Sequence, residues 1–168
     1  MHLTLRPFRP STDSAPLLDW IAGPAELVTW AGPAFGWPLD DAQLAAYAAE
    51  PGRHTWTAVS DTDRPLGHIS LRRHPDAPGA RVGRVLIAPD ARGRGLGEIL
   101  LTQAIDRAFG ELGLTELDLG VYAHNTAAVR LYEKLGFQTQ QVLRDVEQVE
   151  GVWWTALQMR LTSPNSPQ

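Results

Sequence analysis

One run, residues 85–97, constrains the fold of this chain more than any other segment. It begins as a short apolar strand, leaves it at Pro89, continues through an Arg/Gly loop and leads into a helix predicted over 98–112. Glycines keep side chains away from a ligand, and a helix N-terminus presents free N–H groups and the positive end of its dipole. The run therefore predicts a phosphate or pyrophosphate site. The residues expected to form it are Arg92, Gly93, Arg94, Gly95, Leu96, Gly97 and Glu98.

Two familiar glycine loops do not fit this run. A Walker loop needs Lys followed by Ser or Thr after its last glycine, but Glu98 and Ile99 follow Gly97. A dinucleotide fingerprint beginning at Gly93 needs glycine at position 98. The pattern that fits is Arg-x-x-Gly-x-Gly. A turn before a surface helix, with the arginines in solvent, is the plainer alternative.

A second motif follows a strand predicted over 117–122. Asn125 suits a helix N-cap, apolar residues recur at helical spacing from Ala128 to Leu135, and Gly136 suits the helix end. The pattern N-x-x-A-x-x-L-Y-x-x-x-G-F, together with the glycine loop, resembles the GCN5-related N-acetyltransferase (GNAT) superfamily. The likeness spans roughly residues 1–161, and its specific parts are 85–98 and 125–137.

The resemblance implies an acetyl-CoA-dependent N-acetyltransferase that transfers an acyl group to a primary amine by direct attack. By resemblance, the loop binds the pyrophosphate of coenzyme A, and the backbone of Val85, Leu86 and Ile87 pairs with the pantetheine arm. Tyr132 is then the general acid that protonates the departing thiolate, although a packing role would explain it equally. Asn125 caps its helix, and by resemblance it also contacts the pantetheine or the reacting end of the donor; both roles can hold together.

No general base can be assigned. The ribosomal-protein branch of the superfamily has a glutamate before the valine that corresponds to Val121, and this chain has Gly120 there. Proton acceptors that remain open are ordered water, His68, Tyr122, His124 and Asp118. The missing glutamate keeps a second function open, a catalytically silent sensor of CoA or acyl-CoA. A P-loop nucleotide-binding protein is the least favoured of the three functions, because the Lys-Ser/Thr pair of that loop is absent.

By resemblance, the acceptor wall is expected in residues 23–39, where the superfamily has its variable first and second helices. This segment is rich in Gly, Pro and aromatic residues and cannot form one regular helix. Trp30, Phe35 and Trp37 would line a pocket for an apolar or cationic amine, or would simply close one end of the sheet. The net charge of −4 weakly favours a cationic acceptor. A small amine, an amino acid, an aminoglycoside and a protein N-terminus all stay open.

Composition bounds the remaining possibilities. The 168 residues suit one domain, expected over 1–162, with a disordered tail over 163–168. No cysteine is present, so disulfides and a cysteine acyl-enzyme are excluded. The net charge argues against nucleic acid as the main partner, and no membrane span, secretory leader or short-spaced histidine pair for a metal is evident. We expect a cytoplasmic protein, and the superfamily makes a homodimer plausible.

The pattern predicts a mixed α/β sheet with helices on both faces, in the GNAT-like order β-α-α-β-β-β-α-β-α-β-β. The unit between residues 80 and 122 implies parallel strands because a helix connects them. Strands are expected at 2–8, 55–60, 66–72, 80–88, 117–122, 142–149 and 152–161, and helices at 11–22, 40–49, 98–112 and from Asn125 to Leu135.

Overall fold

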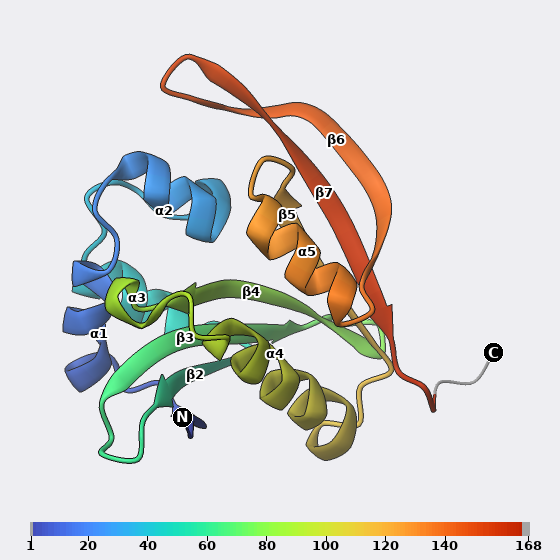
Figure 1. Cartoon of the computed structure of the whole chain (residues 1–168), viewed down its shortest axis with the longest axis horizontal. Coiled ribbons are helices and arrows are strands. Elements are labelled where there is room, and N and C mark those ends of the chain that lie inside the picture. Colours follow the sequence, from blue (N-terminus) through green and yellow to red (C-terminus); the bar gives the residue numbers. More distant parts are fainter. Residues whose placement is uncertain (1, 166–168) are drawn as a thin grey trace.

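The computed structural model describes residues 2–165, which form a seven-stranded mixed sheet with helices on both faces (Figure 1). In space the strands follow the order β1-β2-β3-β4-β5-β7-β6. The strands are β1 (Thr4–Pro7), β2 (Arg53–Val59), β3 (Pro65–Arg73), β4 (Gly79–Ile87), β5 (Glu116–Tyr122), β6 (Gln138–Val149) and β7 (Val152–Thr162). The helices are α1 (Pro10–Asp19), α2 (Pro24–Ala31), α3 (Asp41–Ala48), α4 (Leu96–Asp106) and α5 (Thr126–Lys134), with short helical turns η1 (Gly32–Ala34), η2 (Pro89–Ala91) and η3 (Arg107–Glu111).

The predicted fold class is confirmed, with one helix added to the expected order. Within 23–39, α2 forms between Gly23 and Gly32, whose φ of 61° stops the helix. Pro24 suits the first helical position because its missing N–H needs no partner there. The helix is stabilised by burial of Leu27 and Trp30, a tertiary effect that local Gly and Pro content hides.

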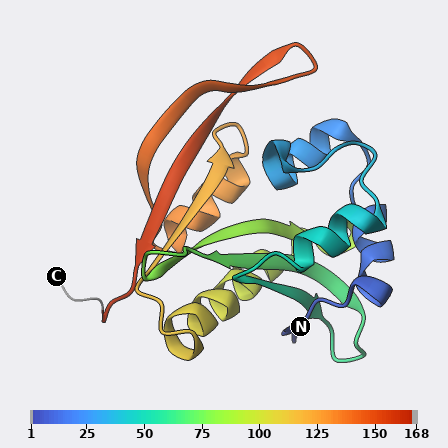
Figure 2. The ribbon, with the colours of Figure 1, turned by 180° about the vertical axis from the view of Figure 1, so that it is seen from behind.

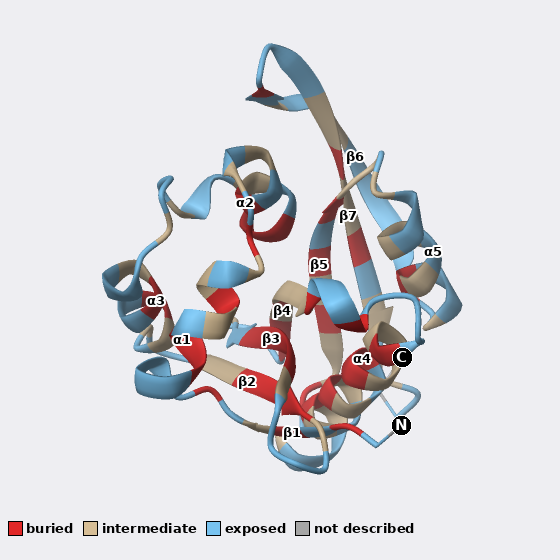
Figure 3. Cartoon of the chain, turned by 60° about the vertical axis from the view of Figure 1, so that its left-hand side comes forward, coloured by how far each residue is buried: buried red, intermediate tan, exposed pale blue. Residues whose placement is uncertain are grey.

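The helices lie in two groups on opposite faces of the sheet. In Figure 1, α4 and α5 lie in front of the strands, and in the reverse view of Figure 2, α3 lies in front. On the α4 side, the main core gathers around Leu100, Leu101 and Phe137. On the other side, α1, α2 and α3 enclose a smaller core that includes Leu17 and Leu44. The buried positions follow these two layers, as Figure 3 shows.

The predicted parallel pairing of β4 with β5 is confirmed, and it is short. The two strands are in register only from Gly79 opposite Glu116 to Arg81 opposite Asp118. On its other side β5 pairs with β7 along its whole length, from Glu116 opposite Thr162 to Tyr122 opposite Ala156. The separation of β4 from β5 leaves the middle of the sheet open between its two faces.

A bulge in β4 changes which side chains face each layer. The register between β3 and β4 shifts between His68 and Ser70, and Arg84 has a φ of 54°, rare for a residue other than glycine. Val85 packs against the α4 core, whereas Leu86 packs against the α1–α3 core. The bulge therefore keeps Arg84 on the α3 side of the sheet, where its guanidinium lies over Tyr47.

The end of the described chain is tied to the sheet by one backbone bond. Ser163 donates its N–H to the Thr115 carbonyl at 2.8 Å. Of the tail predicted over 163–168, residues 166–168 lie outside the described residues. Within residues 2–165, no helix has the length and apolar character needed to cross a membrane.

Candidate active site

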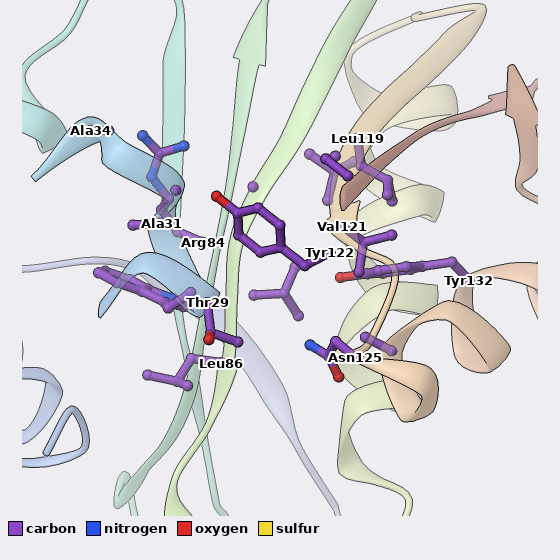
Figure 4. A pocket seen from close by; sticks show the side chains of 18 of the residues that line it. Thr29, Ala31, Ala34, Arg84, Leu86, Leu119, Val121, Tyr122, Asn125 and Tyr132 are labelled. Carbon is purple, nitrogen blue, oxygen red and sulfur yellow. The ribbon is translucent and has the colours of Figure 1, made fainter. Parts of the chain in front are cut away.

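A cavity of about 1080 Å³ lies where β4 and β5 separate (Figure 4). It touches both layers of the molecule, because its walls include Leu101 and Leu131 on the α4–α5 side and Trp30 and Leu86 on the other. Residues of the β6–β7 hairpin complete the wall. The opening in the sheet is thus a passage from one face to the other.

The glycine loop (residues 92–97) meets this cavity at the start of α4. Gly93 and Gly95 have φ values of 77° and 73°, and a Cβ atom at either position would meet nothing within 4 Å. These glycines are therefore required by backbone conformation, and the space beside them is open. Leu96, buried in the core, anchors the first turn of α4, whose N-cap is Gly95. The free N–H groups of that turn suit an anion.

The charged residues of the loop have separate surroundings. Arg92 lines the cavity and donates from Nε to the Ile87 carbonyl at 3.0 Å, at the end of β4. Arg94 lies instead in a second, smaller pocket of about 310 Å³ with Arg64. Glu98 forms an ion pair with Lys134 of α5 at 2.8 Å. Of the predicted loop residues, the structure brings Arg92 and Gly97 to the cavity wall.

Gly97 of α4 faces Leu131 of α5. A Cβ atom at position 97 would lie 3.4 Å from Leu131 Cδ2, which is van der Waals contact. Leu131 and Tyr132 of α5 both line the cavity. Val85, Leu86 and Ile87 also line the cavity.

Tyr132 is buried but its phenol faces the cavity (Figure 4). Its ring packs edge-on against Phe137, with centroids 5.8 Å apart. Among residues 2–165 the hydroxyl has no hydrogen-bond partner, and burial raises the pKa of Tyr132 to about 12. Asn125 lines the cavity too, and its side chain makes no hydrogen bond to the α5 backbone. The N-cap position predicted for Asn125 is confirmed, but its side chain does not cap the helix.

Two of the four side chains considered as general bases lie outside the cavity wall. His68 is fully buried in the α3 layer, where Nε2 meets the Tyr47 hydroxyl at 3.0 Å, and desolvation lowers its pKa to about 3. Asp118 is engaged by Arg81 at 2.9 Å and His74 at 2.5 Å. Both carry structural interactions in this fold.

The other two line the cavity at the end of β5. Burial, with a contribution from Glu147, raises the pKa of Tyr122, so its phenol is a poor base at neutral pH. His124 stacks on Tyr122 and meets the edge of Trp154. Glu147 of β6 also lines the cavity and was missed by sequence reasoning, because no motif marks it.

Of the three aromatic residues expected in the acceptor wall, one lines the cavity in the structure and two do not. Trp30 lines the cavity, and its buried Nε1 has no partner among the described residues. Phe35 lies behind it, stacked at 5.7 Å between centroids. Trp37 is 47% exposed and lies outside the cavity wall. Elsewhere in the described chain, no group of three or more His, Cys, Asp or Glu could hold a metal ion.

The fold and the cavity together define the class of protein. Its mark is a mixed sheet that opens beside the N-terminus of a helix preceded by a glycine loop. The family model described as "Acetyltransferase (GNAT) family" matches residues 25–137. The chain belongs to this family, and the resemblance read from the sequence is confirmed.

Named relatives share the same region. A mycothiol acetyltransferase from Mycolicibacterium paratuberculosis is 33% identical over 174 residues, covering 82% of this chain and 52% of that protein. The peptidyl-lysine N-acetyltransferase YjaB of Escherichia coli is 35% identical over 89 residues, covering 52% of each chain. The chain spans about half the length of these relatives.

Solved structures share the fold at low sequence identity. A spermidine N-acetyltransferase from Vibrio cholerae, in complex with CoA and spermine, superimposes with a TM-score of 0.82 at 20% identity and covers 95% of both chains. This likeness concerns the arrangement of the sheet and helices.

Proposed function

We propose that this chain transfers an acetyl group from acetyl-CoA to a primary amine. The observation that carries the proposal is one cavity that joins the α4 N-terminus, through Arg92 and Gly97, to the unpaired hydroxyl of Tyr132. This shared cavity supports binding of a phosphate-bearing donor next to a group that can donate a proton.

The residues of the glycine loop fit the donor. The space beyond Gly93 and Gly95 is free, and the backbone there can approach a pyrophosphate. Arg92 adds positive charge, and the backbone of Val85–Ile87 borders the same cavity for the pantetheine arm. When bound, the thioester of acetyl-CoA supplies an activated acetyl group.

Tyr132 provides the proton for the leaving thiolate. A phenol with a pKa of about 12 stays protonated at neutral pH. The phenol therefore enters the reaction in its acid form, and we assign it the general-acid role. Asn125 is assigned to orient the donor.

The amine must lose a proton before or during attack. His124 and Glu147 are cavity groups able to accept it, directly or through water. No single base is assigned, because neither is fixed by a hydrogen bond to another described side chain. The acceptor's identity is not transferred from the relatives, whose names specify different amines.

The proposal also includes the extent of the transferase domain. We assign the transferase to one domain over 1–162. The cytoplasmic location and the homodimer expected from the sequence stay predictions.

Calorimetry and turnover test the proposal together. Titration with acetyl-CoA, CoA and ATP should show binding of the first two and not of ATP, and acetyl-CoA with a panel of primary amines should release free thiol. Absence of binding by acetyl-CoA and CoA would refute the proposal. Binding without transfer to any amine would support the alternative, a CoA sensor.

A further inference from the structure

The cavity has an arginine-rich end on the α3 side of the sheet. Arg53, Arg72 and Arg81 lie directly opposite one another on β2, β3 and β4, so they project from one face. The β4 bulge adds Arg84 to that face, where its guanidinium lies 5.6 Å from the ring centres of Phe35 and Tyr47. All four arginines line the cavity.

Two of these arginines are neutralised within the protein. Arg53 forms an ion pair with Glu50 at 2.7 Å, and Arg81 pairs with Asp118 at 2.9 Å. Arg72 and Arg84 have no carboxylate partner among residues 2–165. The Arg84 Nε is buried without a hydrogen bond, and desolvation lowers the Arg84 pKa from its usual value.

Burying a guanidinium without a partner costs free energy unless a ligand pairs with its charge. Burial removes water from the charge, and the positive φ of Arg84 adds backbone strain. A positive charge at a partly enclosed cavity wall attracts an anion more strongly than one in open solvent does. A guanidinium also matches the two oxygens of a carboxylate or a phosphate.

The carboxylates that line the same cavity do not neutralise Arg72 or Arg84. Glu26 accepts a hydrogen bond from the Ala22 N–H at 2.9 Å, within its own helix start. Glu147 comes from β6 and lies beside Tyr122, whose pKa it raises. Neither forms an ion pair with Arg72 or Arg84.

The phosphates of the acetyl donor are assigned to the other layer. The glycine loop joins α4, which packs on the main core, whereas Arg84 contacts Phe35 and Tyr47 of the α1–α3 layer. Two anion-binding ends therefore lie on opposite faces of the passage between β4 and β5.

We propose that the acceptor amine carries an anionic group, a carboxylate or a phosphate, that binds Arg84 and Arg72. The inference rests on the proposed function and specifies its acceptor class. It reverses the cationic acceptor expected from the net charge of −4, because the local charge of the cavity governs recognition and the average over the chain does not.

The test uses amines that differ only in the anion. Tyrosine and tyramine form the carboxylate pair, and phosphoethanolamine and ethanolamine form the phosphate pair. Calorimetry on CoA-saturated protein measures binding, and thiol release measures kcat/KM. We expect the anionic member of at least one pair to be favoured about tenfold or more, as for a charged hydrogen bond, and the pair that responds identifies the anion.

Three variants locate the effect. Arg84→Gln and Arg72→Gln should each reduce the preference for the anionic amine about fivefold or more, and Arg84→Lys should retain part of it. Arg73→Gln is the matched control, because Arg73 is exposed and projects from the opposite face to Arg72. Arg72→Gln alters an exposed side chain, so it tests the proposal even if changes at Arg84 impair folding.

Equal binding of the anionic and uncharged members in both pairs would overturn the inference, as would an anionic preference that survives Arg84→Gln and Arg72→Gln. Either result leaves the proposed function intact if acetyl-CoA still binds and thiol is released. Failure of acetyl-CoA and CoA to bind would be a failure of the proposed function itself.

Discussion

The guanidinium of Arg81 occupies the space that a side chain at Gly120 would need. A Cβ atom at position 120 would lie 2.6 Å from Arg81 Nη2 and 3.2 Å from Gln158 Nε2. Arg81 is held there by hydrogen bonds to Asp118 at 2.9 Å and to Gln158 at 3.1 Å. In this arrangement the position of the glutamate of the ribosomal-protein branch is closed, and a cation replaces a carboxylate.

Gly120→Ala should lower the free energy of unfolding by up to about 1 kcal/mol, because Arg81 must leave Asp118 and the pair is partly exposed. In an Arg81→Ala background, the same change should be neutral or slightly stabilising, since the space is free and alanine restricts the unfolded chain. Urea denaturation of the four proteins gives the coupling energy. An equal loss in both backgrounds would contradict this account.

Gly95→Ala should weaken both the fold and donor binding. Gly95 has a φ of 73°, and the left-handed conformation costs a residue with a Cβ about 1–2 kcal/mol. The same change should weaken CoA binding, because this residue sets the first turn of α4. Urea denaturation and calorimetry with CoA measure the two effects.

Gly110→Ala is the matched control for this substitution. Gly110 lies in η3, without a positive φ, and a Cβ atom there would meet nothing within 4 Å. Alanine should therefore stabilise the protein by about 0.5–1 kcal/mol and leave CoA binding unchanged. If both substitutions shift stability in the same direction, conformation is not the reason for glycine at position 95.

The sequence predicts the parts of this site that depend on local chemistry. The glycine loop and the helix beginning after Asn125 follow from turn residues and helical spacing. The structure confirms the N-cap at Asn125, whereas α4 begins at Leu96, two residues before the predicted start, and gives way to η3 after Asp106. The bulge at Arg84 and the reach of Arg81 over Gly120 depend on contacts between strands distant in sequence. No local pattern carries such information, so the arginine end of the cavity becomes visible only in three dimensions.

Tyr132→Phe should lower kcat about 100-fold or more, with little change in the KM for acetyl-CoA, because it removes only the proposed proton donor. Stability should change little, since the hydroxyl has no partner in the described chain. Tyr47→Phe is the contrast: its buried hydroxyl bonds to His68 at 3.0 Å, so its loss should cost about 1 kcal/mol of stability. Steady-state kinetics and urea denaturation separate the two, and unchanged turnover in Tyr132→Phe would refute the general-acid role.

His68 should make the fold sensitive to acid. Burial lowers its pKa from 6.5 to about 3, so between these values the unfolded chain binds a proton that the folded protein excludes. The stability from neutral His68 is complete above pH 6.5 and is lost as the pH falls toward 3, at up to about 1.4 kcal/mol per pH unit. His68→Gln, which keeps a hydrogen-bonding group beside Tyr47, should flatten the dependence of unfolding free energy on pH between 6 and 4. Parallel slopes for the two proteins in urea denaturation would show that His68 can be protonated in the folded state.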